Sequence, residues 1–245
     1  GRLARFAHRG TSPIIADRLH PHRGIQVSDT QPSPLETIAQ QAKGAMALHA
    51  AYVGVANGLF DALQDLERAE PAELAAAAGV DTDYTARWTD AAYAFGYLDS
   101  NGLGAFGLTE TGALFTSGGG GAPFAIQGAL TAHLTDRAAE CMPSGEQPGE
   151  AVFGERPTLG PLFGPMLEGM FAPFFEREIL PTLAIYREMD EREGLVVDLG
   201  CGNGWYLRRM AQRYPHLRGL GLDPGERAAQ QARELAAADN LADRL

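Results

Sequence analysis

The chain is poor in positive charge and has almost no lysine. Lys43 is the single lysine among 20 basic residues, which face 31 acidic ones, so the formal net charge of the 245-residue chain is −11. Nucleic-acid binding draws much of its affinity from basic side chains that neutralise phosphates. The charge balance therefore argues against a nucleic-acid partner held by phosphate contacts.

Cysteine and long apolar runs are also scarce. Cys141 and Cys201 are the only cysteines, too few and too far apart for a disulfide framework, so a cytoplasmic location is expected. No run approaches the roughly 18 apolar residues of a membrane span, and no secretion signal is evident, so no membrane partner is expected. With 45% hydrophobic and 21% charged residues, the composition is that of a globular protein of one or two domains.

Residues 1–34 differ in composition from the rest. They hold five arginines and three histidines against two acids, and four prolines interrupt any helix. We expect an extended or partly ordered arm that can wrap around a neighbouring subunit. His20 and His22 flank a proline, but no nearby acid or cysteine completes a metal site, so a solvated turn is favoured and no metal is predicted.

From residue 35 to about 121 the pattern is helical and ends in a hairpin. Apolar residues recur at helical spacing over 35–63, and a polar break follows at 65–71. A short helix is expected over 71–79, closed by its glycine, and the next begins at Asp81 or Thr82. Two short strands around residues 100–107 then complete a winged-helix order.

A winged helix commonly binds DNA, and this alternative has to be weighed. The expected recognition helix carries one arginine, Arg87, beside Asp83 and Asp90, and the wing has no basic residue. Reading DNA requires donors aimed at phosphates and base edges. A winged-helix regulatory protein is therefore the runner-up, with DNA binding disfavoured.

The part from 122 to 190 follows four consecutive glycines, which predict a flexible connection. Residues 124–139 are expected to be helical and 141–159 mostly loop. Two helices separated by proline are predicted over 162–186. That last stretch is crowded with methionine and phenylalanine.

The densest chemistry lies between residues 195 and 224. An apolar run suited to a buried parallel strand ends at Asp198, and Gly200, Gly202 and Gly204 follow it. The missing side chains let a ligand approach the backbone and permit a tight turn into a helix. The amphipathic helix expected over 205–214 directs its free N–H groups at the ligand.

A second short strand, 220–222, ends at Asp223, where a carboxylate can accept from both hydroxyls of a ribose. The distance from Gly204 to this acid is close to the roughly 20 residues of nucleotide-binding units. Dinucleotide binders need G-x-G-x-x-G, but the last glycine position is occupied here by Trp205. A dinucleotide site is therefore disfavoured, and a nucleotide-like fold that binds nothing is the other alternative.

This glycine loop with its two acids resembles the opening of a class I S-adenosylmethionine-dependent methyltransferase domain. The resemblance implies that Asp198 helps to hold the methionine moiety and that Asp223 holds the ribose. The cofactor-binding residues it implies are Asp198, Gly200, Cys201, Gly202, Asn203, Gly204, Asp223 and Pro224.

The helical pattern before the glycine run, with residues 58–63 and 108–112 around it, is similar to the N-terminal dimerisation domain of small-molecule O-methyltransferases. The resemblance implies that this module packs against a second subunit, so we expect a homodimer, or a hetero-oligomer with a chain that supplies the rest of the Rossmann-like domain. It also implies that the helices preceding the glycine loop help to form an acceptor pocket, whereas the alternative is that their large side chains are ordinary core. The pocket residues it implies are Phe163, Met166, Met170, Phe174 and Phe175.

The expected fold is thus a mainly α winged-helix or dimerisation domain over 35–121, helices over 122–190, and the first strand–helix–strand–helix part of an α/β Rossmann-like methyltransferase domain over 191–245. The expected function is methyl transfer from S-adenosylmethionine to a natural-product-like small molecule. No catalytic residue is assigned, because the resemblance implies that the adenine-binding acid, the loop after the fourth strand and any catalytic histidine lie beyond Leu245.

Two parallel strands are not stable alone, and the third strand is expected to begin near Leu245. Three explanations stay open: a separate polypeptide completes the domain, the chain is a truncated or cleaved form, or it is a noncatalytic partner that dimerises with an intact enzyme.

Overall fold

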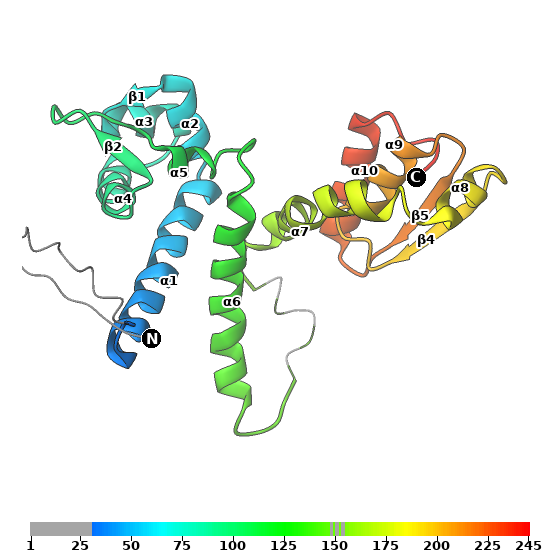
Figure 1. The fold of residues 1–245 in the computed structure, drawn as a ribbon, viewed down its shortest axis with the longest axis horizontal. Coiled ribbons are helices and arrows are strands. Elements are labelled where there is room, and N and C mark those ends of the chain that lie inside the picture. The colour runs from blue at the N-terminus through cyan, green and yellow to red at the C-terminus, as the bar shows by residue number, and fades with distance from the viewer. Residues whose placement is uncertain (1–30, 148, 150–151, 153–154) are drawn as a thin grey trace, which may run out of the picture.

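The computed structural model describes residues 31–147, 149, 152 and 155–245 (Figure 1). The predicted N-terminal arm therefore lies outside the described residues, apart from its last four, and so do His20 and His22. In chain order the elements are α1 (Pro34–Ala56), α2 (Leu59–Leu66), β1 (Arg68–Ala69), α3 (Pro71–Ala78), α4 (Thr82–Ala94), β2 (Leu98–Ser100), β3 (Phe106–Leu108), α5 (Glu110–Ala113), α6 (Ala122–Cys141), α7 (Gly160–Phe174), the π-helical turn η2 (Phe175–Ile179), α8 (Ala184–Asp190), β4 (Leu195–Leu199), α9 (Trp205–Arg213), β5 (Arg218–Leu222) and α10 (Glu226–Ala238).

Local signals start and stop the N-terminal helices. Ser33 and Glu36 form a capping box at the start of α1, and Asp81 caps α4 by accepting from the Tyr84 N–H. Gly79 ends α3 with a left-handed φ of 69°. The region 35–63, predicted as helical, is two helices, because Gly58 with φ 66° turns the chain between α1 and α2.

A small antiparallel sheet of order β1-β3-β2 joins these helices. The predicted hairpin is confirmed, with Leu98 opposite Leu108 and Ser100 opposite Phe106. The polar break predicted after α2 contains a strand that was not expected, in which Ala69 pairs with Phe106. The elements follow in the order helix, strand, two helices and a hairpin, which is the order expected of a winged helix.

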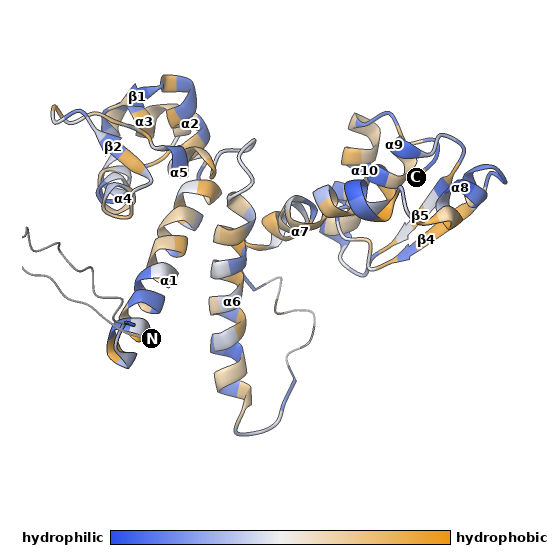
Figure 2. Ribbon diagram, viewed as in Figure 1, coloured by the Kyte–Doolittle hydropathy of each residue, from blue (hydrophilic) through white to orange (hydrophobic). Residues whose placement is uncertain are grey.

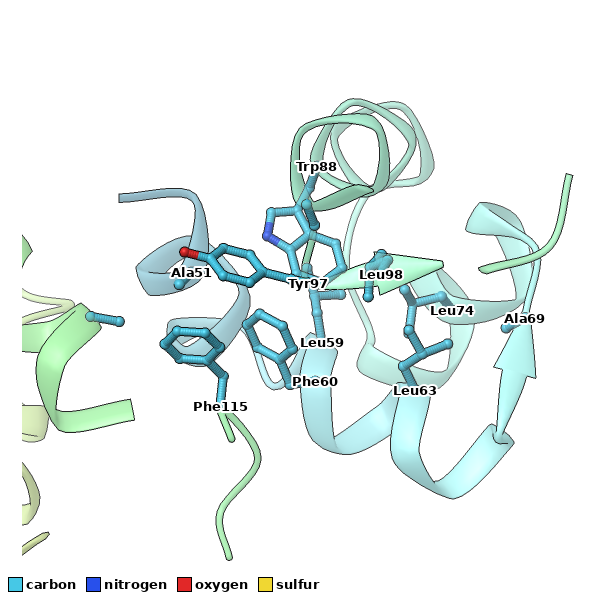
Figure 3. Packing of buried hydrophobic residues seen from close by; sticks show 12 residues of the cluster. Ala51, Leu59, Phe60, Leu63, Ala69, Leu74, Trp88, Tyr97, Leu98 and Phe115 are labelled. Carbon is cyan, nitrogen blue, oxygen red and sulfur yellow. The ribbon is translucent and has the colours of Figure 1, made fainter. Parts of the chain in front are cut away.

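An aromatic core fills this N-terminal module (Figure 3). Phe60, 1% exposed, lies at its centre. The centroid of its ring is 5.2 Å from that of the Trp88 ring and 5.3 Å from that of the Phe115 ring. The Trp88 indole N–H donates to the Ala50 carbonyl, which fixes α4 against α1. Edge-to-face and tilted aromatic pairs of this kind add to the stabilisation from burial.

Two long helices, α1 and α6, lie side by side and lead to the rest of the chain (Figure 1). A second cluster, built on Ile126, Leu130, Leu159 and Met166, packs α7 against α6. In the described part of the chain no helix is both long and apolar enough to span a bilayer.

The four glycines before α6 were predicted to be a flexible connection, and this expectation was wrong. The Gly121 N–H donates to the Leu114 carbonyl at 2.7 Å, and a Cβ on Gly119 would lie 2.4 Å from two backbone oxygens. Gly119 and Gly121 are required because the backbone folds closely onto the end of α5, whereas no atom lies within 4 Å of a Cβ built on Gly118 or Gly120.

The two helices predicted over 162–186 are present. Of Pro173 and Pro181, only Pro181 separates them. Pro173 lies inside α7, which continues through the π-helical turn η2, and the break comes after Leu180, where Pro181 precedes α8. A π-helical turn after an internal proline accommodates the disturbed hydrogen-bond ladder without ending the helix.

The C-terminal part is a parallel β4–β5 pair with α9 packed on one face. Arg244 supports it by donating to four carbonyls at the end of α9 and in the loop after it. The Gly219 N–H, on the side of β5 away from β4, donates to the Arg244 carbonyl.

The other face of the pair is apolar and exposed, and Figure 2 colours β4 as largely hydrophobic. The prediction that these strands are buried on both faces is therefore not met by the described residues. The side chains on this face, here called the open sheet face, are exposed by 45–77%: Leu195, Val197, Leu199, Leu220 and Leu222.

Candidate functional site

The carboxyl ends of β4 and β5 meet at the glycine loop. The N–H groups of Gly200 and Cys201 both donate to the Leu222 carbonyl, at 2.7 and 3.1 Å. This pairing brings the two predicted acids to one edge, because Asp198 stands opposite Gly221 and Asp223 follows β5 directly. Ligands of open parallel sheets bind at this edge.

All three predicted loop glycines have left-handed backbones, with φ of 78° at Gly200, 55° at Gly202 and 71° at Gly204. No protein atom lies within 4 Å of a Cβ built on Gly200 or Gly202, so both face open space. A Cβ on Gly204 would lie 3.1 Å from the Ala232 Cβ, so this glycine lets α10 approach the loop. The loop thus combines a conformation that favours glycine with an accessible backbone.

Asp223 holds the loop in shape. Its Oδ2 accepts from the Gly202 N–H at 2.8 Å, and its Oδ1 accepts from the Gly225 N–H at 2.7 Å across Pro224. Each carboxylate oxygen can accept a second hydrogen bond. The carboxylate therefore retains capacity for two hydroxyl donors while it fixes both flanking loops.

Asp198 is half-buried on the face of the sheet that carries α9. Burial raises the pKa of its carboxyl, and the nearby Asp223 carboxylate raises it further. A cationic group bound near the two acids would offset the repulsion between them. Paired carboxylates of this kind favour a ligand that carries positive charge.

Cys201 and Tyr206 flank the loop as neutral groups. Burial raises the pKa of the Cys201 thiol, and the two acids add to the effect, so the reactive thiolate is disfavoured. Burial likewise raises the pKa of Tyr206, whose hydroxyl lies 2.9 Å from that of Tyr186. Sequence reasoning missed this tyrosine pair, since α8 and α9 carry its members separately.

Asn203 is 1% exposed, and its side chain points to α7 rather than into the open space of the loop. Its amide donates to Glu168 Oε2 at 3.2 Å, and its Oδ1 accepts from the Trp205 N–H. Glu168 also pairs with Arg208 and Arg209 of α9. These contacts were not predicted, because nothing in the local sequence relates α7 to the loop.

The five residues implied for an acceptor pocket do not gather in one place. Met166 is 1% exposed in the cluster between α6 and α7, where Phe163 and Met170 also pack, whereas Phe174 is 57% exposed. Phe175 lies against Trp205 and Tyr206, next to the glycine loop. Most of the set thus behaves as core, and the pocket assignment stays a prediction.

In the described ranges no three His, Cys, Asp or Glu side chains gather in a way that could hold a metal ion. His216 lies beyond the opposite end of β5, where its N–H donates to Asp190.

A parallel strand with an acid near its end, a G-x-G-x-G turn into a helix, and an acid directly after the neighbouring strand together are the features of the opening of a Rossmann-like domain. Comparison with known proteins agrees. Residues 196–245 match the family model described as "Methyltransferase domain".

Solved structures with this fold include small-molecule methyltransferases. An O-methyltransferase family protein from Burkholderia thailandensis is 25% identical, with a TM-score of 0.58 over 88% of this chain and 63% of its own. LaPhzM is 22% identical, with a TM-score of 0.62 over 86% of this chain and 65% of its own. NcsB1 of neocarzinostatin biosynthesis, in complex with S-adenosylmethionine and a hydroxynaphthoic acid, is 23% identical, with a TM-score of 0.55 over 81% and 63%. This chain therefore spans slightly less than two thirds of these relatives.

Proposed function

We propose that this chain binds S-adenosylmethionine at the glycine loop and serves methyl transfer to a small, natural-product-like acceptor. The observation that carries the proposal is Asp223, which fixes the loop through two backbone N–H groups and keeps capacity for two ribose hydroxyls. Two of the similar structures, the Burkholderia thailandensis protein and NcsB1, are named as O-methyltransferases, which supports the proposal.

The residues present suit the cofactor. The Asp198 carboxylate would pair with the ammonium group of the methionine moiety, and the N–H groups at the start of α9 would face its carboxylate. Cys201 and the glycines leave the backbone accessible, and Asn203 holds the loop from behind. Methyl transfer from a sulfonium chiefly requires that donor and acceptor be held in line, so this half of the site supplies orientation.

We further propose that additional polypeptide covers the open sheet face in the active assembly. Five large apolar side chains are exposed there, more than an isolated sheet face should present to water. The covering segment belongs either to a companion chain or to a longer form of this one. A noncatalytic partner role is the alternative, in which an intact methyltransferase would pair with this chain.

We propose that two copies of the chain associate through α1. Residues 35–46 of this helix expose three large apolar side chains, Leu35, Ile38 and Met46, by 56–75%. An apolar helix face of this kind suits a second copy or a related subunit.

Calorimetric titration of S-adenosylhomocysteine into the purified chain tests the cofactor proposal. Asp223→Ala should weaken binding by about tenfold to a hundredfold, because it removes charged hydrogen bonds to the ligand and the support of the loop. Asp190→Ala is the matched control, since Asp190 accepts from the His216 and Leu217 N–H groups at the other end of β5.

Equal losses in the two variants would mean that only the stability of the strand pair matters, and the cofactor site would be refuted. An absence of binding to the unaltered chain would favour the noncatalytic role or the need for the covering polypeptide. Titration after addition of a co-purifying protein separates those two outcomes.

A further inference from the structure

Helix α7 contacts the glycine loop through two residues that lie one turn apart, Gly164 and Glu168. A Cβ on Gly164 would lie 2.8 Å from the Asn203 Cβ, so only glycine lets the loop come this close to the helix. Glu168 follows on the same face and accepts from the Asn203 amide at 3.2 Å. The loop side chain is thus held both by shape and by a charged hydrogen bond.

The Glu168 carboxylate is itself fixed from the other side. Arg208 and Arg209 each donate to one of its oxygens at 2.7 Å, and Arg208 also pairs with Asp239 at 2.8 Å. The Arg208 side chain is 7% exposed and that of Glu168 is 17% exposed. Charged groups this deeply placed need their partners, so the carboxylate has little freedom to move.

The same helix also contacts the N-terminal part of the chain. A Cβ on Gly169 would lie 2.7 Å from the Pro123 Cγ, so α7 packs closely on the start of α6. A shift of α7 would therefore change the position of Asn203, and with it the conformation of the loop.

We infer that Glu168 is a positioning residue that sets the conformation of the cofactor loop through Asn203 and couples that loop to α7. The inference deepens the proposed function and rests on it for the identity of the ligand. In the unliganded protein, Glu168 keeps the loop ordered. Its role is indirect, since Glu168 points at the loop's supporting side chain and not into the open space before Gly200 and Gly202.

Hydrogen exchange of the loop amides, residues 200–205, tests this claim without a ligand. Glu168→Gln should speed their exchange by about tenfold, the effect of weakening a charged hydrogen bond. Glu176→Gln is the matched control, because Glu176 pairs with Arg209 at 3.3 Å, on the same arginine but away from Asn203. Unchanged exchange in Glu168→Gln, or the same change in both variants, would overturn the inference.

A side-chain swap separates positioning from a general loss of stability. Asn203→Asp places a second carboxylate against Glu168 and should speed loop exchange. Adding Glu168→Gln restores one amide and one carboxylate at this contact but not the ion pairs with Arg208 and Arg209, so exchange should be slower than in Asn203→Asp alone without reaching that of the unaltered chain. Exchange in the double variant as fast as in Asn203→Asp alone, with both single variants folded, would also contradict the inference.

Titration of S-adenosylhomocysteine into the same variants distinguishes the two proposals. We expect about tenfold weaker binding in Glu168→Gln, and tighter binding in the swapped pair than in Asn203→Asp alone. If the unaltered chain does not bind while the exchange results hold, the cofactor proposal fails for this chain and the positioning role stands.

Discussion

The two ends of the molecule bury their apolar residues very differently. In the N-terminal module Phe60 is 1% exposed among other aromatic rings, whereas Leu199 on β4 is 77% exposed. The first region has a closed core of its own, and the second has a well-formed loop on a sheet with one open face. A precise backbone at the glycine loop thus does not require that the whole sheet be covered, because Asp223 and Glu168 hold the loop from two sides.

Alanine substitutions at Phe60 and Leu199 test this comparison between the two regions most directly. Phe60→Ala should lower the free energy of unfolding by about 3–5 kcal/mol, because it leaves a cavity among aromatic rings. Leu199→Ala should change it by less than about 0.5 kcal/mol, because the side chain is already in water. Denaturant unfolding of the purified chain measures both values.

A large loss in Leu199→Ala would show that the open sheet face is covered in solution. The same pair of variants measured in a complete assembly should then differ less, and this would support the proposed covering polypeptide.

Two glycines of α1 compare a packed with an unpacked position on one helix. A Cβ on Gly54 would lie 2.4 Å from the Phe60 ring, so Gly54→Ala should destabilise the chain by about 1–3 kcal/mol through overpacking. Gly44 has no atom within 4 Å of its Cβ position, and Gly44→Ala should stabilise by about 0.5–1 kcal/mol through helix propensity. Thermal unfolding checks the two signs, and a stabilising Gly54→Ala would contradict the described packing.

The smallest effect is expected at Asp198. Its folded-state pKa is raised, mainly by burial, so the folded state binds this proton more tightly than the unfolded state does. The carboxylate therefore costs stability above its folded pKa, and the cost disappears as pH falls through that pKa towards the unfolded value. Asp198→Asn should be slightly more stable at neutral pH, with a gain that vanishes in acid, while S-adenosylhomocysteine binding weakens. Unfolding curves at several pH values test this, and a gain that grows in acid would show the wrong sign.

Features with a local cause could be predicted from the sequence. The caps at Asp81 and Gly79, the hairpin, and the strand–glycine loop–helix unit each depend on residues close in sequence. The strand at Arg68–Ala69 was missed because its only support is pairing with β3, far along the chain. The glycine run before α6 was misread because the backbone it packs against is not evident from composition.

The candidate site divides in the same way. The chain's own pattern placed two acids and three glycines at one strand edge, because neighbouring parallel strands end together. Only the tertiary structure decided that Asn203 faces Glu168, that most of the methionines and phenylalanines of α7 pack as core, and that one sheet face stays open. The physical reason is range: turns, caps and strand ends follow from neighbouring residues, whereas ion pairs and packed faces depend on where distant segments meet.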